Sequence, residues 1–136
     1  MSVVVLDNEA VQAIVDPHHA KHRRVIAHLE GALTRRRRGD GVPVVVPCAV
    51  RVEAAWDRST PTGSAIRRFR VTDVALDRAQ SDLAAAIVSR DRVSVADAHV
   101  GAAVTLNDWR GAVILTSDPD DMRRVCAPVT VTPVRV

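Results

Sequence analysis

Four acids are candidates for catalysis, each close to the end of an apolar run or inside a predicted helix: Asp7, Glu53, Asp97 and Asp118. Several carboxylates in one cleft repel one another, so they stay ionised together only if cations neutralise their charge. Oxygen ligands of this kind suit Mg²⁺ or Mn²⁺. Such ions can deprotonate a water molecule and stabilise the charge that develops on a phosphate under attack. The four acids therefore predict a metal-dependent hydrolytic site, provided that the fold brings them together.

Each acid also has an explanation that involves no chemistry. Asp7 and Asp118 can cap the helices that follow them. Ser94 and Asp97 have the spacing of a capping box, and Glu53 can lie on a solvated helix face. The combination favours a site, because Glu53 stands among apolar residues and an acid in such surroundings needs a partner.

The segments around these acids are predicted to alternate between strands and helices. Short runs of Val, Ile and Leu predict buried strands, and the segments between them have helical spacing. The expected strands are 3–6, 42–46, 69–75, 111–115 and 129–134, and the expected helices are 8–15, 19–34, 47–57, 77–89, 94–106 and 118–125. This alternation indicates an α/β fold, a three-layer sandwich with a mostly parallel central sheet. In such folds the chemistry lies at the carboxyl ends of the strands, where three of the acids converge and Glu53 can lean over them.

Size and composition fit one compact domain that spans residues 1–136. Hydrophobic residues make up 47% of the chain, which is enough to form a core. The apolar runs are far shorter than the ~20 residues that a membrane-spanning helix needs, so no membrane partner is expected. The first apolar run has no basic region before it and meets Asp7 at once, unlike a signal peptide, and we therefore expect a cytoplasmic protein.

The positive charge of the chain comes almost wholly from arginine. The net charge is +3, and Lys21 is the only lysine. A run of four arginines is a candidate RNA-binding segment, because guanidinium groups bind phosphates: Arg35, Arg36, Arg37 and Arg38. A solvated basic loop explains this run equally well, and aromatic residues, at 2% of the chain, offer few platforms for stacking bases.

Four segments of the sequence resemble the ordered acidic motifs of PIN domains, and most closely those of the VapC-type toxins of bacterial type II toxin–antitoxin systems. They are Leu6–Asp7, Val52–Trp56, Ala96–Ala103 and Leu115–Met122. The resemblance covers essentially the whole chain. One departure is that the family often has Thr or Ser directly after the first acid, where this chain has Asn8.

The resemblance implies a Mg²⁺- or Mn²⁺-dependent endoribonuclease that acts as a toxin. In this interpretation Asp7, Glu53, Asp97 and Asp118 hold the metal, and Thr116 supports the site through a hydrogen bond. The resemblance also implies an RNA substrate, a cognate antitoxin whose tail lies over the acidic groove, and a homodimer. The apolar face of the expected helix 19–34 could serve the dimer or pack into the core: Val25, Ile26, Leu29 and Leu33.

Two other classes of protein share parts of this pattern. Haloacid-dehalogenase-like phosphatases and response-regulator receivers also place acids after the first strand of a parallel sheet. Both normally use a lysine near that edge, whereas Lys21 is expected in a helical region far from any strand end, and the phosphatases need Asp-x-Asp where this chain has Asp7-Asn8-Glu9. The other alternative is a PIN-like module without catalysis that binds RNA or protein, against which the presence of all four acids argues.

Overall fold

The computed structural model describes residues 2–39, 42–59 and 67–136, without the side chains of Arg36 and Arg37. Within this part of the chain, five strands form a single sheet in the order β3-β2-β1-β4-β5, and every neighbouring pair is parallel. The strands are β1 (Ser2–Leu6), β2 (Val44–Pro47), β3 (Thr72–Val74), β4 (Gly111–Thr116) and β5 (Thr132–Arg135).

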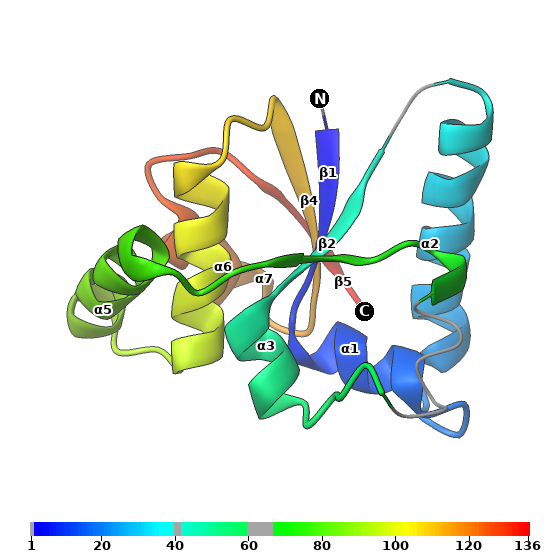
Figure 1. Ribbon diagram of the computed structural model, residues 1–136, viewed down its shortest axis with the longest axis horizontal. Helices are drawn as coiled ribbons and strands as arrows, with labels where there is room; N and C mark the ends of the chain where they lie inside the picture. The colour runs from blue at the N-terminus through cyan, green and yellow to red at the C-terminus, as the bar shows by residue number, and fades with distance from the viewer. Residues whose placement is uncertain (1, 40–41, 60–66) are drawn as a thin grey trace.

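Helices cover both faces of the sheet, so the predicted three-layer α/β sandwich is confirmed. Figure 1 shows α2 on one side of the strands and α6, with α5 outside it, on the other. The described helices are α1 (Asn8–Val15), α2 (His22–Arg37), α3 (Cys48–Glu53), α5 (Arg78–Asp91), α6 (Val95–Leu106) and α7 (Pro119–Cys126). No helix in the described ranges is long and apolar enough to cross a bilayer.

The centre of the sheet brings the ends of β1 and β4 together. Leu6 lies opposite Leu115 in the parallel register, and both side chains are buried. The next residue continues this pairing, because the Asp7 amide donates to the Leu115 carbonyl at 3.2 Å. The residues that follow the two strands therefore meet at the carboxyl edge of the sheet, as the topology predicts.

Helix α6 is built from small residues that let its neighbours approach closely. An added Cβ on Gly101 would lie 2.3 Å from the carbonyl oxygen of Val125 in α7, closer than side-chain atoms pack. The flanking residues Ala98, Ala102 and Ala103 are fully buried. This close packing fixes the first turn of α6 relative to α7, and so relative to the edge where β4 ends.

The end of α3 differs from the expected helix 47–57. The helix stops at Glu53 because Ala55 adopts a left-handed conformation with φ of 53°. The Trp56 amide then donates to the Arg51 carbonyl at 2.9 Å, and the Ala55 amide to the Val52 carbonyl at 3.1 Å. These bonds form a Schellman motif, usually made with glycine, which is why the alanine did not indicate a helix end.

The second helix also begins later than expected. Residues 16–21 form turns, and α2 begins at His22 and continues to Arg37, so most of the arginine run is helical and the predicted basic loop is wrong there. Val25 and Leu29 are fully buried, while Ile26 and Leu33 are partly buried against the same core. Core packing therefore accounts for the apolar face of α2.

Candidate active site

Asp7 lies at the centre of the carboxyl edge and is almost fully buried. Its carboxylate caps α1 by accepting from the Ala10 amide at 2.9 Å, and it also accepts from the Ser117 amide, beyond β4, at 3.3 Å. Burial raises the pKa of Asp7 above its ordinary value. Hydrogen bonds from the Ala10 amide, the Thr116 hydroxyl and the Ser117 amide oppose this effect, and the charge of Glu9 adds to it.

Thr116, the last residue of β4, connects two of the predicted site acids. Its side chain is fully buried, and its hydroxyl accepts from the Asp118 amide at 2.9 Å. The same hydroxyl hydrogen-bonds to the Asp7 carboxylate and lowers the pKa of that group. Thr116 therefore contacts both Asp7 and Asp118, and its role in supporting a metal site stays a prediction.

Asp97 lies in the first turn of α6, where the Ser94 hydroxyl accepts from its amide at 3.1 Å. Its side chain is partly buried. The pKa of Asp97 is raised to about 6, first by burial and then by the negative charges of four other acids: Asp7, Glu53, Asp121 and Asp118. This electrostatic coupling places the four predicted acids, together with Asp121, around one region of the molecule.

Glu53 and Asp118 lie at the exposed rim of this region. Asp118 caps α7 by accepting from the Asp121 amide at 3.2 Å, and Asp121 forms an ion pair with Arg124 at 2.6 Å. Glu53 is the last residue of α3 and is exposed to solvent. The expectation that apolar surroundings make Glu53 need a partner is wrong, because Glu53 and the adjacent Val52, 80% exposed, both face solvent.

Capping and clustering of the acids turn out to be compatible. Asp7 and Asp118 are helix caps, yet both contribute to the negative field at Asp97. In the described parts of the chain, no group of three or more His, Cys, Asp or Glu side chains stands in a ready-made metal-binding arrangement. The donor set still fits Mg²⁺ or Mn²⁺, since it consists of carboxylate oxygens whose mutual repulsion a cation would relieve.

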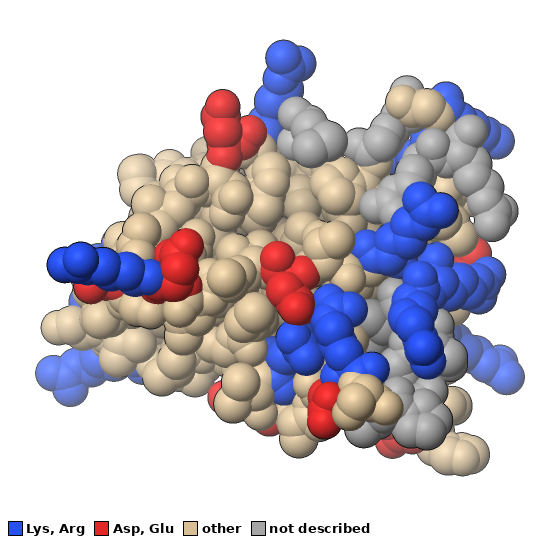
Figure 2. Space-filling model, viewed as in Figure 1, with Lys and Arg blue, Asp and Glu red and all other residues tan. Residues whose placement is uncertain are grey.

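The arginine run lies away from the acids. Helix α2 leads into β2, so its last turn lies at the edge where the strands begin, opposite the carboxyl edge. Arg35 and Arg38 are exposed there, and the side chains of Arg36 and Arg37 lie outside the described residues. The side of the molecule over α2 carries mainly basic groups (Figure 2).

The surroundings of Lys21 differ from the expectation. Lys21 precedes α2, and its ammonium group lies 3.3 Å from the Glu9 carboxylate, in the first turn of α1 after β1. His19 contacts the same carboxylate at 3.3 Å. Glu9 is therefore paired with these two side chains. Lys21 was expected in a helix far from any strand end, but it lies in a turn and contacts the helix that directly follows β1.

The sequence did not predict the contacts that three groups of residues make near this edge. His99 is fully buried, and its Nδ1 accepts from the Ala49 amide at 3.2 Å, which ties α6 to the start of α3. Burial lowers the pKa of His99. Arg51 and Arg58 stack on Trp56 and pair with Asp73, where acidic and basic groups lie against one another over β3 (Figure 2).

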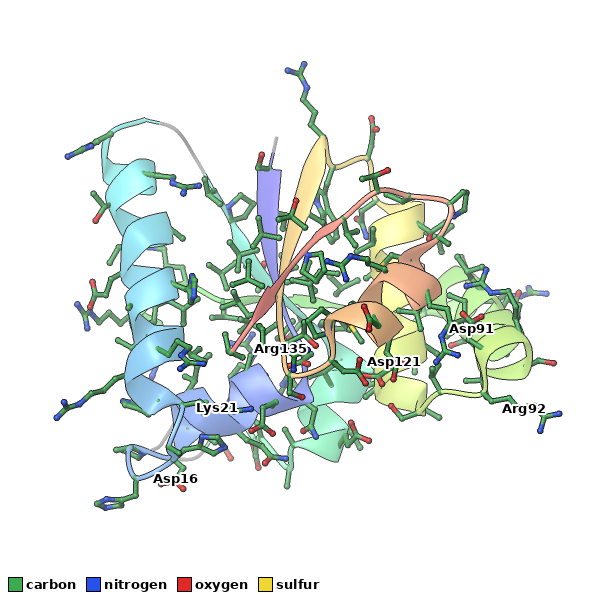
Figure 3. All side chains as sticks on the ribbon, turned by 180° about the vertical axis from the view of Figure 1, so that it is seen from behind. Asp16, Lys21, Asp91, Arg92, Asp121 and Arg135 are labelled. Carbon is green, nitrogen blue, oxygen red and sulfur yellow. The ribbon has the colours of Figure 1, made fainter. Side chains whose placement is uncertain are left out.

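Arg135, at the end of β5, belongs to the third of these groups. It lies opposite Thr116 in the register and donates to the Ser117 carbonyl at 3.2 Å. Figure 3 shows Arg135 and Asp121 in the same lower part of the molecule. Only the pairing of β5 with β4 places Arg135 here, and no sequence motif marks it.

Comparison with solved structures supports the fold. No family model and no curated protein matches the sequence. The chain is similar to a chain in the crystal structure of VapBC2 from Rickettsia felis bound to a DNA fragment from their promoter, with 9% identity, a TM-score of 0.58, and coverage of 97% of this chain and 98% of that one. It is also similar to a chain in the structure of FitAB bound to an IR36 DNA fragment, with 14% identity, a TM-score of 0.58, and coverage of 97% and 94%. At these identities the likeness shows that the chains share a PIN-like fold.

Proposed function

We propose that the protein is a Mg²⁺- or Mn²⁺-dependent endoribonuclease that acts as the toxin of a toxin–antitoxin pair. The observation that carries the proposal is the meeting of Asp7 and Asp118 beyond the paired ends of β1 and β4, linked through Thr116 and Ser117. Asp97 lies near them, and its pKa is raised by burial and then by the charges of Asp7, Glu53, Asp121 and Asp118. Mutual repulsion of this kind costs stability, and a bound cation removes the cost.

The proposed metal ligands are Asp7, Glu53, Asp97 and Asp118. When bound, the cation would supply an activated water and electrostatic stabilisation of the phosphate under attack. Asp7 is held by three hydrogen bonds, including one from Thr116, so its carboxylate is fixed before a cation arrives. Glu53 and Asp118 are exposed and would complete the ligand set from the solvent side.

The toxin role rests on the structural neighbours and on the surface around the acids. Both neighbours are toxin–antitoxin complexes. In this chain Val52 and Val95 are 80% and 60% exposed, and they lie one and two residues before Glu53 and Asp97. Exposed apolar groups on the helices that carry the acids suit a protein partner better than RNA. We propose that a cognate antitoxin covers Val52, Val95 and the neighbouring acids, and that the protein forms a homodimer in the cytoplasm.

The proposal is tested by incubating the purified protein with a mixed pool of cellular RNA, with Mg²⁺, with Mn²⁺ and with a chelator. Asp97→Asn removes the charge that a cation needs, and Asp82→Asn, an exposed position on α5, is the matched control. We expect metal-dependent cleavage by the wild type and by Asp82→Asn, and none by Asp97→Asn. Equal cleavage by all three proteins in chelator would rule out the proposed mechanism.

A non-catalytic PIN-like module that binds RNA or protein is the second candidate. It is favoured by the lack of a ready-made metal-binding group among the described residues. This candidate predicts that neither metal induces cleavage and that the metals do not stabilise the protein against unfolding. Stabilisation by Mn²⁺ that is lost in Asp97→Asn would argue against it.

A further inference from the structure

Arg135 is connected to the acidic edge through one backbone residue. Its Nη1 donates to the Ser117 carbonyl at 3.2 Å, and the amide of the same Ser117 donates to Asp7 Oδ2 at 3.3 Å. The strand that carries Arg135 is fixed to β4, since the Val136 amide donates to the Thr116 carbonyl at 2.9 Å. The guanidinium group therefore has a defined position next to the residues that follow β4.

The charge of Arg135 is not used within the described part of the chain. Arg123 and Arg124, on the neighbouring α7, form ion pairs with Asp120 and Asp121. None of the ion pairs between described residues involves Arg135, although it lies at the edge where the acids gather. A guanidinium group has five N–H donors, and a single hydrogen bond to the Ser117 carbonyl leaves most of them available in an exposed side chain.

A positively charged side chain beside the acids would help an RNA strand to bind there. A cluster of carboxylates repels the phosphates of an RNA strand, and a neighbouring positive charge reduces that repulsion. Arginine suits this task because its planar fork matches two phosphate oxygens. The arginine run at the end of α2 lies at the opposite edge of the sheet, so it cannot neutralise a phosphate at the acids.

We propose that Arg135 is a substrate-binding residue that holds a phosphate of the RNA strand beside the acidic site, on the side of β5. This inference rests on the proposed ribonuclease function and adds a specific contact to it. The Ser117 carbonyl orients the guanidinium group, and the remaining donors bind the phosphate. The contact is with the backbone of the strand, so it acts on RNA of any sequence.

The test measures binding of a short single-stranded RNA as a function of salt concentration, in the Asp97→Asn background and with Mg²⁺ present, so that cleavage does not interfere. Arg135→Gln is the main variant, because glutamine removes the charge and keeps a donor for the Ser117 carbonyl. Arg135→Lys keeps the charge without the fork. Arg110→Ala, an exposed arginine before β4 at the opposite edge, is the control.

Loss of one phosphate contact on single-stranded RNA lowers the slope of log K against log salt by about 0.7. We expect this change for Arg135→Gln, with binding weakened about tenfold at low salt, while Arg135→Lys keeps the slope and Arg110→Ala changes nothing. An unchanged slope in a folded Arg135→Gln protein would overturn the proposal and leave a structural role for Arg135.

The outcomes separate this proposal from the ribonuclease function. If the wild type cleaves RNA and Arg135→Gln has the parent slope, the function stands and the role of Arg135 is wrong. If the wild type binds RNA without cleaving it and Arg135→Gln lowers the slope, the contact stands and the enzymatic function is wrong. If the Asp97→Asn protein does not bind RNA at any salt concentration, the contact is overturned whatever the cleavage assay shows.

Discussion

Asp97 is the position where burial and negative charge act together on one carboxylate. Its side chain is partly buried, and four other acids raise its pKa further, to about 6. The ionised form of this group is therefore less stable in the folded protein than in the unfolded chain. An acid kept at such a cost is typical of a functional site.

Replacing Asp97 by Asn should stabilise the protein when no divalent cation is present. Each tenfold change in proton affinity corresponds to about 1.4 kcal/mol, and solvent screens part of the effect, so we expect the free energy of unfolding to rise by about 1–2 kcal/mol at neutral pH. Urea unfolding in chelator measures it, with Asp82→Asn as the control. A less stable Asp97→Asn protein would mean that burial and the neighbouring acids do not destabilise the ionised Asp97.

The same raised pKa determines how stability depends on pH. Between the unfolded value of 3.8 and about 6, the folded protein holds the Asp97 proton more tightly than the unfolded chain does. The contribution of Asp97 to the free energy of unfolding therefore decreases as pH rises through this window. In chelator, the difference in stability between Asp97→Asn and wild type should be smallest near pH 4 and fully developed above pH 6.

The Thr116 hydroxyl can be removed with little change of shape. In Thr116→Val the Asp7 carboxylate loses a hydrogen bond that lowers its pKa, and the Asp118 amide loses its acceptor. We expect a loss of about 1 kcal/mol in the free energy of unfolding and weaker stabilisation by Mn²⁺. Thr116→Ser keeps the hydroxyl and should retain the cation effect, whereas equal losses in both variants would point to packing of the methyl group.

At the scale of elements, the end of α3 depends on an unusual residue. Ala55 has a φ of 53°, a left-handed conformation that costs an L-residue about 1–2 kcal/mol. Glycine avoids this strain, but its greater freedom in the unfolded chain offsets part of the gain in stability. Ala55→Gly should therefore raise the free energy of unfolding by about 0.5–1 kcal/mol. Ala54→Gly, one residue earlier at a right-handed position, should lower it by a similar amount. The two opposite signs, measured by urea unfolding, test the Schellman motif that ends α3 directly after Glu53.

The contact between α6 and α7 depends on the absence of a side chain at Gly101. An added methyl group would meet the Val125 carbonyl at 2.3 Å, so Gly101→Ala should destabilise the protein by about 2 kcal/mol or more. Gly31→Ala is the matched control, because nothing lies within 4 Å of its added Cβ in the exposed part of α2. This control should stabilise the protein by about 0.5–1 kcal/mol. Thermal unfolding of both variants measures these changes. A Gly101→Ala protein as stable as the wild type would contradict the close contact between α6 and α7.

At the scale of the whole molecule, the sequence predicted the architecture because the strands are nearly continuous apolar runs. The helix 8–15 matches the structure to the residue, and Asp7 caps its start. The helix 94–106 ends at Leu106 as expected, and Ser94 is the N-cap directly before its first residue. Other boundaries failed where local chemistry gave no signal. Ala55 hides the end of α3, and polar turns before His22 resemble the start of a helix.

The candidate site was predictable in part for the same physical reason. In a parallel sheet the residues after adjacent strands must meet, so Asp7, Thr116 and Asp118 follow from topology alone. Arg135 could not be found in this way, because its role depends on which edge β5 joins and on its register with Thr116. Likewise, the exposure of Glu53 follows from where α3 ends and not from its apolar neighbours in the sequence.

A metal site at Asp97 is best tested by the rate of RNA cleavage as a function of Mn²⁺ concentration, for the wild type, Asp97→Asn and Asp82→Asn in one series. We expect the wild type and Asp82→Asn to show the same saturable dependence on Mn²⁺, with no cleavage in chelator. We expect Asp97→Asn, although folded and more stable in chelator, to lose at least 100-fold in rate, about 2.7 kcal/mol in barrier height. Cleavage by Asp97→Asn at the wild-type rate would mean that the acids are helix caps and not a metal site.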